Sequence, residues 1–534
     1  MNISSSIRKL TNLFILLFIA LSGGLVYWQA VAAEPVISNE HNNRHCLLEN
    51  APLRGRIFDR NGVLLADSKA DPRARCGYMR HYYENSLAGV IGYYAGPNYP
   101  ATGLERQYDD VLSGRRGTTS LDNAVNQTLH KPPVGDDVYL TIDVRIQRLV
   151  DQHFDDPVHI DNRLAYATDR GSVIVTNPHT GEVLALLSRP GYDPNKMVQT
   201  LQAGDTTYHD QLAADKGQPL LMRPLQGRYP PGSTYKTMTL IAGLDSGKTT
   251  LNQEFDEKQA RGPVYYNGHP IGPVGNNIDG YTFHFPVTTE YGFTHSDNVI
   301  FAQIGVNTGY NAWLDYNKRF YVGQQIPFDL PVQPSSVLPP DGHQMNDVEL
   351  ASDSFGQGYD FVTPFQMSLV DNAVANDGQL MRPLLVSKVA DHNNNALQTF
   401  GPQILGTPFS SQTATQVRQA MYDVTRCGSG SIVQALLTST MGIIGKTGTA
   451  EVSGTGDIPP HGWLITQAPY TLNSPTQLPP LTIVGMKEKG GEGGFAVGPM
   501  TAHMYNDIFS QGYVQAQLPP PPDRNYCSQT GMIQ

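Results

Sequence analysis

The sequence predicts an α+β fold in which helices cover an antiparallel sheet. Strand-like segments lie at 172–187 and again at 445–486, and helix-like segments lie between them. This order brings distant strands into one sheet and places the intervening helices on its faces. Hydrophobic residues make up 40% of the 534 residues and charged residues 16%, which allows large cores and argues against wholesale disorder.

The first predicted element is a transmembrane anchor at 10–33, after a short cytoplasmic tail at 1–9. The segment is uncharged and longer than the roughly 20 apolar residues that a membrane span needs. Arg8 and Lys9 precede it, and a basic flank favours a cytoplasmic N-terminus. The alternative is a signal peptide cleaved near Ala32. Both interpretations place the rest of the chain outside the cytoplasm, and the uncleaved anchor would contact membrane lipid.

Residues 34–164 are predicted to form an N-terminal domain of mixed, strand-rich pattern. Asn61-Gly62 lies there between apolar runs, and this dipeptide favours a tight hairpin turn. The region 165–517 follows as the main domain. A tail occupies 518–534, where four consecutive prolines predict a stiff extended segment.

The main domain begins with a predicted β-hairpin, whose strands at 172–176 and 182–187 flank a short turn. The later predicted elements, in chain order, are a helix at 235–244, strands at 445–452, 462–466 and 481–486, and a helix at 502–509. Together they supply the strands and the helical layers of the predicted fold.

Charge and cysteine content restrict the function. The net charge of −11 argues against nucleic acid as a partner, because phosphate binding needs a basic face. The four cysteines, Cys46, Cys76, Cys427 and Cys527, form no C-x-x-C pair, which gives a zinc or thioredoxin-like site little support. Outside the cytoplasm they could form disulfides. All three complete pairings remain open, as do free thiols.

Ser233 and Lys236 form the first candidate chemical motif, in Pro-Gly-Ser-Thr-Tyr-Lys at 231–236. Pro and Gly before a helical run place Ser233 at a helix start, and positions three apart share a helix face. A buried, neutral amine can take the proton of a neighbouring hydroxyl. The helix dipole favours the negative charge that develops there. Alone, the motif is also typical of an ordinary helix start.

Two further motifs follow, Ser296-Asp297-Asn298 and the segment 446–450, which reads Lys-Thr-Gly-Thr-Ala. The first alone is typical of a polar loop. On an edge strand, the second would present a cation, hydroxyls and backbone N–H groups to a cleft. The order S-x-x-K, S-D-N, K-T-G is the motif set of β-lactamases and penicillin-binding proteins, so the three together carry more weight than each one.

Nearly the whole chain resembles a class B penicillin-binding protein. The segment 54–66 resembles the signature R-G-x-I-x-D-R-N-G-x-x-L-A of that class. Further resembling segments are Gly103-Leu104-Glu105, Leu140-Thr141-Ile142-Asp143, Thr180-Gly181-Glu182-Val183, Tyr192-Asp193-Pro194-Asn195, Gly356-Gln357-Gly358 and His461-Gly462-Trp463. The resemblance implies the penicillin-binding transpeptidase fold with a helical subdomain, an N-terminal pedestal or dimerisation-type domain, and no metal or organic cofactor.

The resemblance implies a catalytic role for three residues. Ser233 would attack a D-alanyl-D-alanine stem peptide of peptidoglycan and form an acyl-enzyme. Lys236 would be the general base, and Ser296 would relay a proton to the leaving amine. The backbone N–H groups of Ser233 and Thr449 would form the oxyanion hole. The amine of a second stem peptide would then take the acyl group.

The resemblance also implies how substrate is held. Asn298 would bind an amide of the stem peptide. Lys446, Thr447, Gly448 and Thr449 would form the strand that binds the terminal carboxylate of the donor. β-Lactams should acylate the serine as substrate mimics, and a glycan polymerase of the SEDS family is the expected protein partner.

Other functions remain as alternatives or are disfavoured. A D,D-carboxypeptidase would use the same site with water as acceptor. A non-catalytic scaffold would bind penicillin without catalysing the cross-linking reaction. Glu349 is the only glutamate between the second and third motifs, and it lacks the asparagine of the E-x-x-N arrangement of class A β-lactamases. The region before the main domain is too short for a glycosyltransferase domain, and one span does not fit a β-lactam-sensing receptor.

Overall fold

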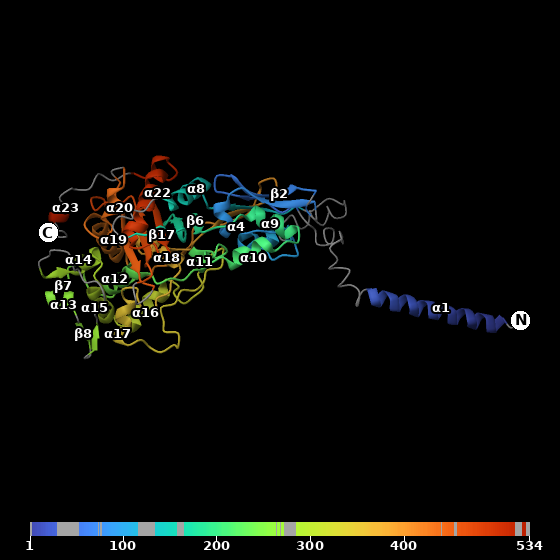
Figure 1. The fold of residues 1–534 in the computed structure, drawn as a ribbon, viewed down its shortest axis with the longest axis horizontal. Helices are drawn as coiled ribbons and strands as arrows, with labels where there is room; N and C mark the ends of the chain where they lie inside the picture. Colours follow the sequence, from blue (N-terminus) through green and yellow to red (C-terminus); the bar gives the residue numbers. More distant parts are fainter. Residues whose placement is uncertain are drawn as a thin grey trace.

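A computed structural model describes residues 3–28, 53–72, 74, 77–115, 134–156, 165–262, 264–266, 269–271, 285–438, 441–452, 457–517 and 526–529. The body contains two main sheets: the one with β17 lies among helices, and the one with β2 lies at the end of the body nearest α1 (Figure 1). The prolines at 519–522, together with Cys46 and Cys76, lie outside the described residues.

Helix α1 (Ile3–Val26) is the apolar helix near the N-terminus. Its segment Ile7–Val26 has a mean hydropathy of 1.9 and buries none of its side chains against the rest of the protein. Among the described residues it is the one helix long and apolar enough to cross a membrane. The structure therefore agrees with an anchor, although residues 29–33 of the predicted span lie outside the described ranges.

The predicted antiparallel sheet is present. Its strands are β5 (Gly171–Thr176), β6 (Val183–Arg189), β15 (Ile444–Ala450), β16 (His461–Ala468) and β17 (Leu481–Lys487). They lie in the order β15-β16-β17-β5-β6, so strands from both ends of the main domain meet at the β17–β5 pair. This arrangement places β15 at an edge.

Helices cover both faces of this sheet. Because side chains alternate along a strand, Val175 and Ile483 face a cluster with α8 (Val144–Phe154) and α22 (Gly498–Ser510). Their neighbours Ile174 and Val484 face the opposite cluster. That cluster includes residues of α12 (Lys236–Asp245), α18 (Pro364–Ala375) and α19 (Ser411–Arg426). The sheet is thus the middle layer between two helical layers.

The second sheet is mixed and has the strand order β13-β12-β4-β1-β2-β3. Its strands are β1 (Ile57–Phe58), β2 (Leu64–Ala70), β3 (Tyr78–Tyr82), β4 (Asp137–Leu140), β12 (Val386–Ala390) and β13 (Ala396–Thr399). β1 and β2 are antiparallel around the predicted Asn61-Gly62 turn, where Gly62 has a φ of +80°. β12 and β13 come from the region assigned to the main domain, so this sheet joins two distant parts of the chain.

The remaining helices are η2 (Asn85–Leu87), α4 (Ala88–Ile91), α5 (Gly103–Gln107), α6 (Asp109–Leu112), α9 (Pro194–Gln202), α10 (Thr207–Ala214), α11 (Arg223–Gln226), η4 (Gly232–Tyr235), α13 (Glu257–Arg261), α14 (Thr289–Thr294), α15 (Asn298–Thr308), α16 (Tyr310–Arg319), α17 (Asp347–Asp353), α20 (Ser431–Ala435), α21 (Gly493–Ala496) and α23 (Tyr526–Gln529). Short strand pairs are β7 (Glu254–Phe255) with β10 (Val287–Thr288), β8 (Val264–Tyr266) with β9 (His269–Ile271), and β11 (Leu380–Met381) with β14 (Ile404–Gly406).

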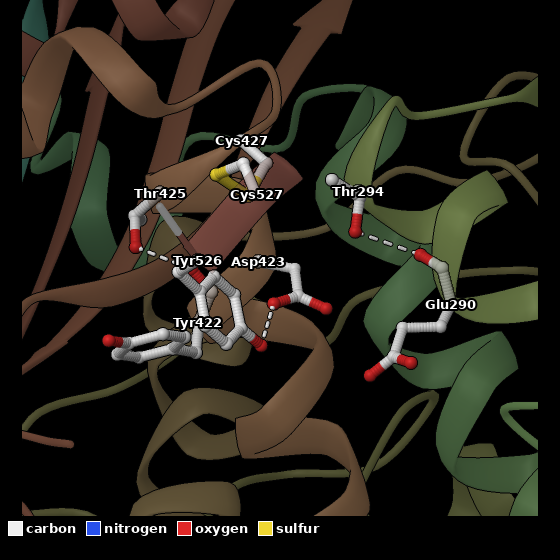
Figure 2. The surroundings of a disulfide bond; sticks show 8 residues. All are labelled: Glu290, Thr294, Tyr422, Asp423, Thr425, Cys427, Tyr526 and Cys527. Atoms are coloured by element: carbon white, nitrogen blue, oxygen red, sulfur yellow. Dashed lines mark hydrogen bonds between the residues drawn. A yellow bond between two sulfur atoms is a disulfide. The ribbon is translucent and has the colours of Figure 1, made fainter. Parts of the chain in front are cut away.

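A disulfide fixes α23 to the end of α19. It joins Cys427 to Cys527. The sequence left the pairing of the four cysteines open, and the structure gives this pair. Figure 2 shows Tyr526 beside the bond, with its hydroxyl donating to Asp423 at 2.6 Å. Burial and the nearby Glu290 carboxylate raise the pKa of Asp423 to about 8. The C-terminal helix therefore covers a pair of buried acids on the helical layer.

A buried ion cluster ties the N-terminal region together. The Glu105 carboxylate accepts from Arg54 Nε at 2.7 Å and from Arg80 Nε at 2.6 Å, and all three side chains are almost fully buried. Burial favours the neutral form of Glu105, but the two guanidinium groups outweigh it and lower the pKa of the carboxyl. The carboxylate is thus the shared counter-charge of two buried cations.

Replacing Glu105 with leucine should lower the free energy of unfolding of this region by about 3 kcal/mol, because two guanidinium groups would lose their buried partner. Hydrogen exchange of the amides of β2 and β3 measures the effect. Glu257→Gln is the control, since Glu257 pairs with Arg261 at an exposed helix surface and should cost less than about 0.5 kcal/mol. Equal protection in both variants would contradict the prediction.

Candidate active site

Ser233 lies in the single-turn helix η4, which leads directly into α12 as the sequence predicts. Gly232 before it has a φ of +54°, a conformation that favours glycine. A Cβ at Gly232 would lie 2.5 Å from the carbonyl oxygen of Thr449. The glycine thus allows the edge strand β15 to approach the turn that carries the serine.

Ser296 lies in the short connection between α14 and α15 and has a φ of +63°, which is uncommon for a residue other than glycine. The next residue, Asp297, caps α15, because its Oδ1 accepts from the backbone N–H of Ile300 at 2.8 Å. Asn298 begins the helix. The cap and the turn together determine where the Ser296 and Asn298 side chains project.

Lys446 lies within β15, which is at the edge of the sheet and, among the described strands, pairs with β16 alone. Its amine donates to Ser296 Oγ at 2.9 Å and to the carbonyl of Thr447 at 3.1 Å. The side chain is fully buried. The third motif is therefore in contact with the second, at the edge of the sheet.

The Lys236 amine connects the first two motifs. It donates to Ser233 Oγ at 3.0 Å, to Ser296 Oγ at 3.2 Å and to Asn298 Oδ1 at 2.6 Å. The Ser296 hydroxyl therefore lies between the amines of Lys236 and Lys446. Because these contacts run from Ser233 to β15, a proton has a continuous path of donors and acceptors across the site.

Burial changes the charge of both lysines. It lowers the pKa of Lys236 to about 7, and the nearby Asp297 carboxylate limits the fall. Burial also lowers the pKa of Lys446 far below its usual range, and the charge of Lys236 adds to the shift. Two amines that share one hydroxyl disfavour two positive charges. A neutral lysine beside the Ser233 hydroxyl is therefore accessible near neutral pH.

The structure brings together all eight candidate residues. Thr447 Oγ1 is 2.6 Å from Ser429 Oγ, and a Cβ at Gly448 would lie 2.8 Å from Thr234 Cγ2. Ser429 is a site residue that sequence reasoning missed, because its segment carries only the turn signals of two glycines. The sequence places Asp297 in the second motif and assigns it no role of its own, whereas in the structure it caps α15. Among the described residues, the one group able to ligate a metal lies elsewhere, at His153.

Comparison with known families agrees with this geometry. Residues 171–478 match the penicillin binding protein transpeptidase domain, and residues 54–138 match the penicillin binding protein A dimerisation domain. The chain belongs to the penicillin-binding protein transpeptidases. The predicted resemblance to class B penicillin-binding proteins is confirmed, and so is the predicted fold.

Relatives of this penicillin-binding protein share most of its length. Peptidoglycan D,D-transpeptidase PbpA of Mycolicibacterium smegmatis is 29% identical over 505 residues, which cover 92% of this chain and 94% of the relative. Peptidoglycan D,D-transpeptidase MrdA of Escherichia coli is 28% identical over 71% of this chain and 62% of its own. The imipenem acyl-enzyme complex of penicillin-binding protein A from M. tuberculosis superposes with a TM-score of 0.73 at 27% identity and covers 87% of this chain and 100% of that one.

Proposed function

We propose that this protein is a serine D,D-transpeptidase that cross-links peptidoglycan stem peptides. The observation that carries the proposal is the Lys236 amine, which is buried and 3.0 Å from Ser233 Oγ. This contact pairs a nucleophile with a base of suitable pKa. The names of the relatives and the acyl-enzyme complexes of the structural neighbours support the same chemistry.

Acylation has two steps: the serine adds to the substrate carbonyl, and the terminal D-alanine then leaves. Ser233 Oγ bonds to the carbonyl carbon of the penultimate D-alanine while Lys236 takes the hydroxyl proton. The bond to the terminal D-alanine then breaks, and Ser296 delivers a proton to its amine, which the 3.2 Å contact with Lys236 supports. Backbone N–H groups of Ser233 and Thr449 stabilise the oxyanion. The acceptor amine reverses these steps and forms the cross-link.

Substrate binds along the edge strand. Lys446, Thr447 and Thr449 hold the terminal carboxylate of the donor, and Gly448 allows the strand to lie close to the serine turn. Asn298 binds a stem-peptide amide. A bound carboxylate favours the charged form of Lys446, which offsets the effect of its burial. β-Lactams present a similar carboxylate and carbonyl, so they acylate Ser233.

The apolar helix α1 anchors the enzyme in membrane lipid, with Arg8 and Lys9 on the cytoplasmic side. The catalytic domain, 165–517, then lies outside the cytoplasm, where peptidoglycan is cross-linked. The N-terminal domain, 34–164, acts as a pedestal. Together with the anchor it contacts a glycan polymerase of the SEDS family, since a transpeptidase needs glycan strands that another enzyme supplies.

Competition between water and an amine for the acyl group tests this function. The full chain in detergent micelles receives a D-alanyl-D-alanine donor peptide and an amine acceptor, and mass spectrometry separates the amide product from the hydrolysis product. We expect the amide to form and to increase with acceptor concentration. Hydrolysis alone would indicate a D,D-carboxypeptidase. Absence of both products, with no labelling by penicillin, would indicate a non-catalytic scaffold.

A further inference from the structure

Two histidines and two aspartates meet between α8 and α22, on the sheet face opposite α12. Asp156 Oδ2 lies 2.9 Å from His153 Nδ1 and 2.6 Å from His503 Nδ1. His153 is buried, and Asp156 and His503 are half-buried. One nitrogen from each of His153 and His503 and one oxygen of Asp156 lie within 4.8 Å of one another. Three ligand atoms of types that transition metals prefer thus converge at one point.

The second nitrogen of His153 has a carboxylate of its own. His153 Nε2 lies 2.9 Å from Asp507 Oδ2, one helical turn after His503 on α22. A neutral imidazole has one N–H, so it can donate to only one of the two carboxylates. Both contacts are favourable when a cation occupies the Nδ1 side, either a proton or a metal ion. In metal sites, a ligating histidine commonly donates its other N–H to a carboxylate, as His153 does here toward Asp507.

We propose that His153, His503 and Asp156 bind a divalent transition-metal ion of the zinc class, and that Asp507 orients His153. Two imidazoles and one carboxylate form a known type of zinc ligand set, which leaves a position for water. Zinc bonds of about 2.0–2.2 Å separate neighbouring ligands by roughly 3.3 Å, so the present contacts need to open by about half an ångström. Rotation of the half-exposed His503 side chain supplies such a movement.

The ion would join the end of α8 to the middle of α22. Asp156 lies two residues beyond the end of α8, and His503 and Asp507 lie on successive turns of α22. Both helices cover the same face of the main sheet. The ion would thus lie on the face of the sheet opposite the active-site helix α12.

Zinc binding to the untagged full chain in detergent micelles tests the proposal. After removal of metal by a chelator, equilibrium dialysis with zinc and elemental analysis give the bound amount, and cobalt substitution gives the visible absorption of the ligand set. We expect one zinc per chain and a higher unfolding temperature with zinc. His503→Ala should weaken binding at least about 100-fold, and Asp507→Asn about 10- to 100-fold.

His343→Ala is the matched control. His343 also lies between two carboxylates, with Nδ1 2.6 Å from Asp341 and Nε2 2.9 Å from Glu349, but among the residues that the structure describes no second imidazole joins them in a metal-binding group. Its loss should leave zinc binding unchanged. Labelling by fluorescent penicillin shows that each variant is folded. Zinc binding that is absent from the wild type, or equal in the wild type and His503→Ala, would overturn the proposal and leave a hydrogen-bonded cluster of side chains.

Discussion

Replacing Ser233 with alanine is expected to lower the rate of covalent labelling by fluorescent penicillin by more than about 10⁴-fold. The hydroxyl oxygen forms the new bond to the β-lactam carbonyl, and the alanine variant offers no atom for that bond. Lys236 remains nearby, but an amine at the helix face cannot replace the oxygen without displacing its contacts with Ser296 and Asn298. Time-resolved gel fluorescence of the full chain measures the rate.

Ser246→Ala is the control for this experiment. Ser246 follows α12, and its hydroxyl donates to the carbonyl of Ala242, away from the site. Labelling of this variant should match the wild type. Peptide mapping identifies the labelled residue. Label on any residue other than Ser233, or labelling of Ser233→Ala at the wild-type rate, would contradict the assignment of the nucleophile.

Replacing Lys236 with methionine is expected to slow acylation by about 10³-fold, the scale of a lost general base. Methionine keeps most of the buried volume and removes the amine. In the wild type, the rate should also depend on pH, because burial lowers the pKa of Lys236 to about 7. The neutral amine is the base, so the rate should fall about tenfold per pH unit below 7 and reach a plateau above it.

Lys248→Met is the control, because Lys248 is an exposed lysine beyond the end of the same helix. Its rate and pH profile should match those of the wild type. The pH profile also distinguishes a base from a packing residue, since a structural role would not produce a titration near pH 7. A wild-type profile that is flat between pH 5 and 8 would contradict the role of Lys236.

Local pattern predicted the main sheet well. Apolar runs bounded by turn residues identify β5, β6, β16 and β17, and the hairpin signal at Asn61-Gly62 gives the β1–β2 turn. Spacing alone indicates that Ser233 and Lys236 share a helix face, and their 3.0 Å contact follows from it. These features depend on residues close in sequence, so local physical chemistry is sufficient for them.

Features that depend on distant pairing could not be predicted in this way. β12 and β13 join the N-terminal sheet from a region far along the chain, and nothing in their short apolar runs identifies that partner. The contact between Ser429 and Thr447 depends on how α19 packs against β15. The close approach of Gly232 to Thr449 likewise becomes visible only when the strand is in place.

The Cys427–Cys527 bond closes the segment 427–527 into a covalent ring. Its two cysteines are 100 residues apart in sequence, and β15, β16, β17 and α22 all lie between them. A ring of this size restricts the unfolded chain substantially, by about 4.7 kcal/mol in the chain-entropy description. Protein produced in a reducing cytoplasm would contain an open chain instead. Inhibitor affinities measured on such material would therefore describe a different covalent species from the enzyme that folds under oxidising conditions.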